Sequence, residues 1–234
     1  SKKRYDKIFH IFLILIALTV FFRKLCTIII ILFVLFSILN YKRLYFKKKD
    51  LLFLIIISSP LSLQLLFFWN NNSLFAGLKS LEKLSTLLFF PILIIGNLER
   101  VNFLKILKWY TRGSILILIL LLFRFIFTSP KFFNTYLEGK DLWEVGYEFT
   151  RSFGMHAPAL NMHLAFITTS LFYFILNCLN KKNKVISKRL IFNIILLIFG
   201  FFLILFVNTR LALVELFLGM IIVFFMTFER SLFK

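Results

Sequence analysis

The sequence predicts an all-α protein, a polytopic transmembrane helical bundle of about eight spans. Hydrophobic residues make up 60% of the 234 residues, and the mean hydropathy is +0.91, whereas a globular chain is about 45–50% apolar. Long uncharged apolar runs recur along the whole length, and about 20 such residues cross a bilayer. The polar gaps between them are too short for a separate folded domain, so residues 1–234 are read as a single transmembrane domain.

Eight apolar runs define the expected spans. They cover residues 8–22, 25–39, 51–69, 74–95, 114–127, 157–179, 190–207 and 211–228. The first two are short and predict a thin or tilted hairpin that turns at Arg23 and Lys24. Pro60 predicts a kink in the third run, and the fifth could begin as early as Phe103. A polar outer loop is expected at residues 129–155.

The basic residues set the expected orientation. With the N-terminus in the cytoplasm, 19 Lys and Arg fall in cytoplasmic segments and 6 in outer segments. Short cytoplasmic loops of membrane proteins carry such an excess of positive charge. The sequence therefore predicts that both the N-terminus and the C-terminus lie in the cytoplasm.

The same placement of charge argues against other classes. A net charge of +19 could indicate nucleic-acid binding, but the cations sit in short loops between apolar runs and no groove-reading motif is present. Cys26 and Cys178 lie in apolar runs without metal-ligand spacing. His156 and His163 are seven residues apart, too far for the usual i, i+4 metal pair. We therefore expect no nucleic acid, no metal and no cofactor.

Charged residues inside apolar runs are candidates for function, because burying a charge in the bilayer is costly. Lys79 and Lys83 share one helix face and could bind an anion, although an amphipathic half-helix explains them equally simply. Arg124, near the outer end of the fifth run, could snorkel to the interface or bind an anion. Arg210 lies at the turn between the last two runs beside Asn208 and Thr209, and its planar fork of donors suits a phosphate.

The outer loop and the start of the sixth run supply further candidates. Trp143 and Tyr147 could stack on sugar rings, and the nearby acids could accept sugar hydroxyls. Arg151 and His156 stand where the loop enters the span, and His156 could carry a proton or donate to an anion. His163, two turns deeper, is expected to be a buried, hydrogen-bonded side chain.

Two segments resemble the O-antigen ligase and O-antigen polymerase superfamily of bacterial membrane proteins. In VNTRLALVELFLGMIIVFF, Thr209, Arg210 and Ala212 match the family's outer turn, while Leu211 replaces a frequent Gly. In RSFGMHAPALNMHLAF, the residues that fit are Arg151, Gly154, His156 and Pro158, with Ala157 separating the His from the Pro. The family's His-Asn-x-x-Leu type motif is absent, and the chain resembles the N-terminal part of a longer family architecture.

The resemblance implies a membrane glycosyltransferase of the ligase or polymerase type in the bacterial inner membrane. Such an enzyme transfers or polymerises a glycan carried on undecaprenyl diphosphate at the periplasmic face, as part of lipopolysaccharide or related surface polysaccharide assembly. His156 would be the catalytic base and Trp143 and Tyr147 would bind the glycan. The residues implied for the diphosphate are Arg210, Arg151, Arg124, Lys79 and Lys83.

Two other classes stay open on the residues alone. A transporter or permease would also show kinks, intramembrane charge and this distribution of cations, but it predicts interrupted helices in both halves of the chain. The helix-interrupting prolines, Pro60 and Pro91, both lie in the first half. The third class is an inactive membrane fragment or a scaffold. Membrane lipids are expected partners in every case.

Overall fold

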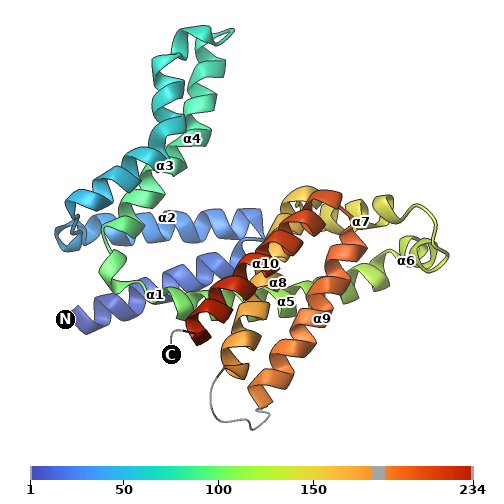
Figure 1. The fold of residues 1–234 in the computed structure, drawn as a ribbon. Coiled ribbons are helices and arrows are strands. Elements are labelled where there is room, and N and C mark those ends of the chain that lie inside the picture. The colour runs from blue at the N-terminus through green and yellow to red at the C-terminus, as the bar shows by residue number, and fades with distance from the viewer. Residues whose placement is uncertain (1, 181–187, 233–234) are drawn as a thin grey trace. The chain divides into compact units, whose positions relative to one another are not determined.

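A computed structural model describes residues 2–180 and 188–232, except for the side chains of residues 2, 3, 83, 85, 86, 89, 90 and 228–232. Within these ranges the regular structure is entirely helical, which confirms the predicted all-α class (Figure 1). The α-helices are α1 (Lys2–Thr19), α2 (Arg23–Leu39), α3 (Lys48–Leu66), α4 (Leu74–Ile95), α5 (Phe103–Thr128), α6 (Pro130–Leu137), α7 (Leu142–Arg151), α8 (Ala157–Leu179), α9 (Lys188–Val207) and α10 (Arg210–Leu232). Short 3-10 turns stand at Tyr41–Arg43, Phe68–Asn70 and Leu98–Arg100.

Every predicted apolar run forms a helix, but fewer helices than predicted meet the length and composition of a membrane span. Among the described residues five do so, namely α3, α5, α8, α9 and the part of α10 at Arg210–Thr227. α2 has only 17 residues, while α1 and α4 carry more than two charges in any stretch of 18. The chain is thus a multi-span helical membrane protein. The count of eight spans and the sides of the termini stay predictions.

The chain divides into two compact units. The first contains residues 1–12 and 28–102, and the second contains residues 13–27 and 103–234. In the first unit, α3 and α4 form a hairpin in which α3 changes direction along its length (Figure 1). Pro60 lacks the N–H that would bond the Ile56 carbonyl, and the Ser59 hydroxyl donates to that carbonyl instead at 2.8 Å. At the predicted kink, the Ile56 carbonyl is therefore hydrogen-bonded by a neighbouring side chain.

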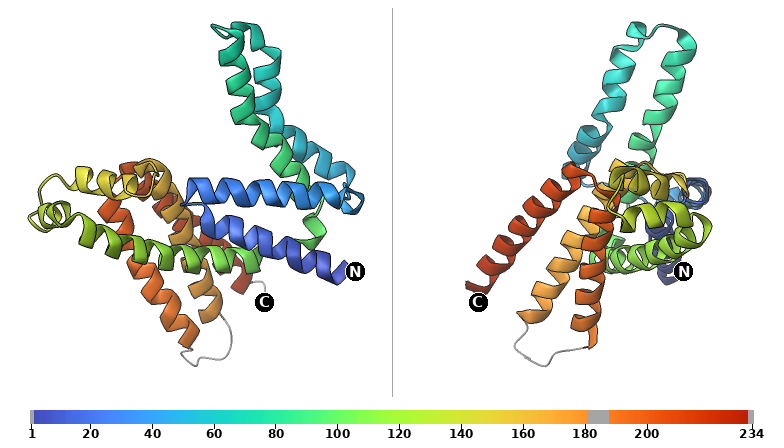
Figure 2. Two further views of the ribbon diagram at one scale, coloured as in Figure 1. Left: turned by 180° about the vertical axis from the view of Figure 1, so that it is seen from behind. Right: turned by 90° about the vertical axis from the view of Figure 1, so that its right-hand side faces the viewer.

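The second unit is built around α8, which packs between α9 and α10 (Figures 1 and 2). Leu160, Leu164, Ile167 and Leu171 recur at helical spacing on α8 and are fully buried. Two glycines bring the neighbouring helices close to α8. A Cβ at Gly200 of α9 would lie 2.6 Å from the Thr168 hydroxyl, and one at Gly219 of α10 would lie 2.7 Å from the Thr169 hydroxyl. Small residues at helix contacts are the usual device of membrane bundles.

Large apolar side chains cover the outside of the spans. On α10, Leu211, Val214, Phe217 and Leu218 each expose more than half of their surface. An apolar surface of this extent is stable only against lipid or a protein partner. The expected contact with membrane lipids is therefore supported.

The segment 129–155 was expected to be a polar loop, and it instead forms the helices α6 and α7 with a short turn between them. α7 buries Val145, Gly146, Phe149 and Thr150 on one face and exposes polar residues on the other. Its buried face packs on α9. The spacing of the apolar residues of α7, three to four apart, suits an amphipathic helix, so the expected outer segment contains regular structure.

Candidate functional site

One end of the second unit gathers most of the residues predicted from the sequence. This end, called the α7 end below, is where α5, α7 and α9 finish and α8 and α10 begin. Gly146 of α7 lies against the last turn of α9, so closely that an added Cβ would be 2.7 Å from the carbonyl oxygens of Phe206 and Val207. The rings of Phe149 and Phe206 meet edge to face at 5.5 Å. α7 is therefore held firmly across the end of α9.

A buried asparagine joins α8 to the turn between α9 and α10. Asn161, fully buried in the second turn of α8, donates from Nδ2 to the Thr209 hydroxyl at 2.6 Å and to the Ile204 carbonyl at 3.3 Å. The turn itself passes through Asn208 in the left-handed region, with φ of 53°, a conformation that Asn adopts more readily than most residues. Arg210 begins α10 directly after this bonded turn.

Arg210 therefore stands at a fixed position with its side chain exposed. It makes no ion pair with any residue in the described ranges. Thr209, which the sequence grouped with it as an outer polar residue, is engaged by Asn161 instead. The backbone beside Arg210 is thus held by the bond from Asn161 to Thr209, while the Arg210 guanidinium pairs with no carboxylate of the described residues.

Three further candidates lie at the same end. His156 is the residue that precedes α8, and its side chain is exposed while its carbonyl accepts from the Leu160 N–H at 3.0 Å. Arg151 is the last residue of α7 and pairs with Glu148 at 3.2 Å. Arg124 is exposed one turn before the end of α5. The structure thus brings Arg124, Arg151, His156 and Arg210 to one end of the unit.

The exposed face of α7 carries the predicted sugar-binding residues. Trp143 and Tyr147 are four residues apart, so they share a face of the helix, and 66% and 43% of their surfaces are exposed. Glu144 and Glu148 stand beside them. Exposed aromatic rings next to carboxylates form a surface suited to sugar rings and hydroxyls.

Lys79 and Lys83 lie in the other unit of the chain. Both belong to α4 in the first unit, where the Lys79 side chain is exposed. The side chain of Lys83 lies outside the described residues. The site described above is therefore built without these two lysines.

His163 has the role expected of it. Its Nδ1 lies 2.7 Å from the Tyr110 hydroxyl of α5, and its ring meets Phe21 at 5.9 Å. The side chain is half-buried and bridges α8 to α5. The predicted hydrogen bond is present, whereas the side chain is half-buried and not fully buried as expected.

An apolar cavity lies along α10 below Arg210. It measures about 400 Å³ and is lined only by apolar side chains of α8, α9 and α10: Phe172, Phe201, Phe217, Met220, Ile221, Phe224 and Phe225. Phe217, Ile221 and Phe224 follow Arg210 by 7, 11 and 14 residues. At 3.6 residues per turn these positions share one face of the helix. Arg210 and the apolar cavity are therefore aligned on the same side of α10.

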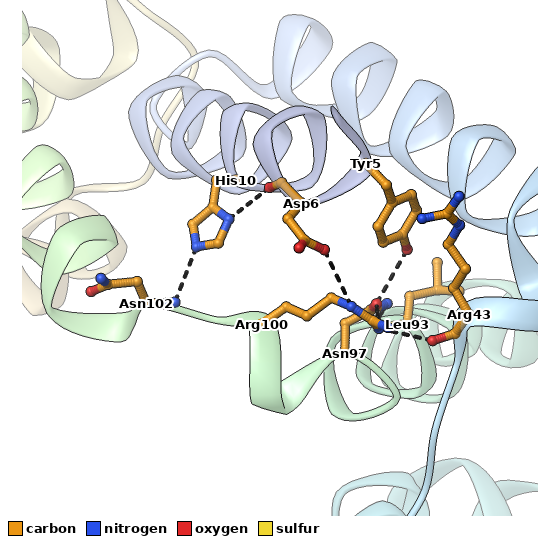
Figure 3. Close-up of polar contacts among 8 residues, drawn as sticks. All are labelled: Tyr5, Asp6, His10, Arg43, Leu93, Asn97, Arg100 and Asn102. Carbon is orange, nitrogen blue, oxygen red and sulfur yellow. Dashed lines mark hydrogen bonds and ion pairs between the residues drawn. The ribbon is translucent and has the colours of Figure 1, made fainter. Parts of the chain in front are cut away.

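The first unit contains a polar network that the sequence did not reveal (Figure 3). At its centre Asn97, 2% exposed, accepts from the Tyr5 hydroxyl at 3.2 Å and from Arg100 at 2.7 Å. Its own Nδ2 donates to the Leu93 carbonyl at 2.8 Å. Arg100 also bonds the Arg43 carbonyl at 2.8 Å and pairs with Asp6 at 3.3 Å. No sequence pattern marks this network, because its members are 92 residues apart along the chain.

The network continues at His10. Its Nδ1 lies 2.7 Å from the Asp6 carbonyl, while its Nε2 accepts from the Asn102 N–H at 3.2 Å (Figure 3). Because a carbonyl can only accept, the proton of the neutral ring is assigned to Nδ1. A cavity of about 500 Å³ adjoins these residues and is lined by both acids and bases. Charges of both signs lie close together there, and the hydrogen bonds and the ion pair join α1 to the segment that follows α4.

Comparison of the chain with models of protein families, with curated protein sequences and with solved structures finds no match.

Proposed function

We propose that the α7 end of the second unit binds the diphosphate of a polyprenyl-linked glycan at the periplasmic face of a bacterial inner membrane. There it takes part in transferring the glycan to an acceptor. The observation that carries the proposal is the alignment of Arg210 with an apolar cavity on the same face of α10. Arg210 follows a turn held by Asn161 and has no ion-pair partner among the described residues. Arg210 suits a diphosphate, and the apolar cavity suits an isoprenoid chain.

The choice of a diphosphate rests on charge and hydrogen-bond geometry. Arg presents a planar fork of donors that can bond two phosphate oxygens at once. Arg210 has no carboxylate partner in the described part of the chain, whereas Arg151 is paired with Glu148. Arg210 is therefore the primary ligand, and Arg151 and Arg124 add positive charge at the same end.

The transfer step assigns a role to His156. The acceptor hydroxyl oxygen attacks the anomeric carbon of the donor sugar as the bond from that carbon to the diphosphate oxygen breaks. His156 accepts the hydroxyl proton, and the diphosphate departs with the bonding electron pair. Arg210 stabilises the negative charge that develops on the leaving group. Trp143 and Tyr147 hold the glycan on the exposed face of α7.

Variants of Arg210 test the proposal by direct binding. Undecaprenyl diphosphate is titrated into the full chain in phosphatidylcholine nanodiscs. We expect Arg210→Ala to weaken binding by a factor on the order of 10 to 100, the loss typical of a hydrogen bond to a charged group. Arg210→Lys should retain part of the affinity, because an ammonium keeps the charge but not the fork.

Lys131→Ala is the matched control, since Lys131 is an exposed cation on α6 and should leave binding unchanged. Equal affinities for the original chain and Arg210→Ala would contradict the proposal and favour an interfacial anchor. No binding by the original chain would favour a transporter of another substrate or a scaffold.

A further inference from the structure

A basic crevice lies at the opposite end of the second unit, where α5 and α9 begin and α8 ends. It consists of two adjoining cavities of about 380 and 370 Å³ that share Lys108 and Arg112. The first cavity is also lined by Arg189, Asn177 and Asn193. The second is lined by Lys105 and by apolar groups, among them Trp109, Leu116 and Phe192.

Arg112 is the centre of this crevice. It lies nine residues after the start of α5, inside the candidate membrane span Phe103–Thr128, where a charge is costly without partners. One of its terminal nitrogens donates to the Asn193 Oδ1 of α9 at 3.0 Å, and its guanidinium lies 5.8 Å from the centre of the Phe192 ring. Asn193 is itself 1% exposed. An asparagine buried in an apolar helix thus orients an arginine at the wall of both cavities.

The crevice has more hydrogen-bond donors than acceptors. Arg112 Nε and Asn193 Nδ2 are buried and meet no acceptor in the described part of the chain. The described residues that line the two cavities include no carboxylate, and the intervening sequence 181–187 contains no Asp or Glu. Buried donors are normally satisfied. An anion in the crevice would supply the negative charge that its described lining lacks.

The two cavities differ in a way that points to the kind of anion. The described lining of one has asparagines and three cations. The other continues from two of these cations, Lys108 and Arg112, onto apolar groups that include Trp109 and Phe192. A free ion would use only the first, whereas a lipid would place its phosphate in the first and an acyl chain along the second. Basic pockets between spans on the cytoplasmic side are known to suit anionic lipid headgroups.

We propose that this crevice binds one anionic phospholipid of the inner leaflet. Its phosphate is held by Lys108, Arg112 and Arg189, and an acyl chain lies against Trp109 and Phe192. This site is distinct from the α7 end and requires none of the residues proposed for glycan transfer. The sequence offers one signal for it, namely the polar Asn193 inside the apolar run at residues 190–207.

Trp109 provides the readout for a test. The Trp69→Phe and Trp143→Phe substitutions leave Trp109 as the remaining tryptophan of the three in the chain. The protein is placed in phosphatidylcholine nanodiscs that contain an equal fraction of either brominated phosphatidylglycerol or brominated phosphatidylcholine. Bromine quenches a tryptophan that it contacts. We expect clearly stronger quenching by the phosphatidylglycerol.

Arg112→Gln in this background should reduce the preference by about tenfold or more, since a hydrogen bond to a charged group is lost. Should that variant fold poorly, Lys108→Gln with Arg189→Gln changes only exposed side chains and should give the same loss. Lys131→Gln, at the α7 end, should keep the preference. Equal quenching by the two lipids would overturn the proposal. So would loss of the preference on adding inorganic phosphate at matched ionic strength, because the site would then recognise the free ion.

Discussion

Gly146→Ala is expected to destabilise the second unit and loosen α7 from α9. The new methyl carbon would lie 2.7 Å from two carbonyl oxygens and 2.8 Å from the Val207 Cα. These are backbone atoms of a helix, so they cannot rotate away as a side chain can. Overpacking of this kind costs about 1–3 kcal/mol. The measurement is thermal unfolding of the purified protein in detergent, followed by helical circular dichroism.

Gly113→Ala is the matched control for this substitution. It also adds a methyl to a helical glycine of the second unit, but the atom in its way is the tip of the Leu18 side chain, which can change rotamer. Replacing a helical glycine by alanine otherwise favours the helix by about 1 kcal/mol. The control should therefore keep or raise the unfolding temperature. An unfolding temperature for Gly146→Ala equal to that of Gly113→Ala would show that α7 does not pack as described.

The same substitution has a consequence for function. Arg151 and His156 follow Gly146 in the chain, and their place at the α7 end depends on the contact between α7 and α9. Gly146→Ala should therefore also weaken undecaprenyl diphosphate binding, although it changes no residue assigned to the ligand. The effect should be smaller than that of Arg210→Ala, because Arg210 is held by the separate bond from Asn161 to Thr209.

Asn97→Leu is expected to destabilise the first unit at least as much as Gly146→Ala destabilises the second. Leucine has the same number and branching of side-chain heavy atoms but accepts no hydrogen bond, so the Tyr5 hydroxyl and one Arg100 nitrogen lose their acceptor. A buried group left unsatisfied costs about 1–3 kcal/mol. Burial raises the pKa of Tyr5, so its hydroxyl stays protonated and needs an acceptor at neutral pH. Thermal unfolding again gives the measurement.

Glu99→Gln serves as the control for that variant. Glu99 lies two residues away and pairs with Lys47 at 2.7 Å, with both side chains largely in solvent. The bond from Lys47 lowers the pKa of Glu99. Its contribution is present above the carboxyl pKa of the unfolded chain and is lost as the pH falls through the lowered value. Exposed pairs add little, so Glu99→Gln should unfold close to the original temperature. An unfolding temperature of Asn97→Leu close to that of the original chain would show that the network does not stabilise the first unit.

The helices could be predicted from the sequence because each apolar run is long and is bounded by charge. Val207 ends α9 as predicted, since Asn208 follows in a conformation that a helix does not contain. α6 and α7 could not be separated from a loop by hydropathy alone. However, the spacing of Val145 and Phe149 on one side, with Trp143 and Tyr147 on the other, does mark α7 as amphipathic.

The candidate site could be predicted only as a set of residues. Arg210 and His156 were identified by type and by their nearness to span ends. The bond from Asn161 to Thr209, which relates them, joins positions 48 residues apart and exists only once α8 packs against α9 and α10. Arg112 precedes the apolar run predicted at residues 114–127, and its bond to Asn193 exists only in the folded bundle. The local sequence pattern therefore predicts which types of residue form the site. Their positions relative to one another depend on how the helices pack.

We propose that the second unit crosses the membrane with its α7 end outside and its basic crevice inside. Site-specific labelling of cysteines tests it most directly. Cys26 and Cys178 are replaced by alanine, and Lys140→Cys or Lys188→Cys introduces one thiol at either end. A membrane-impermeant maleimide is then added to intact bacterial spheroplasts. We expect immediate labelling of Lys140→Cys, and labelling of Lys188→Cys only after detergent is added. The reverse order, or labelling of both from outside, would contradict it.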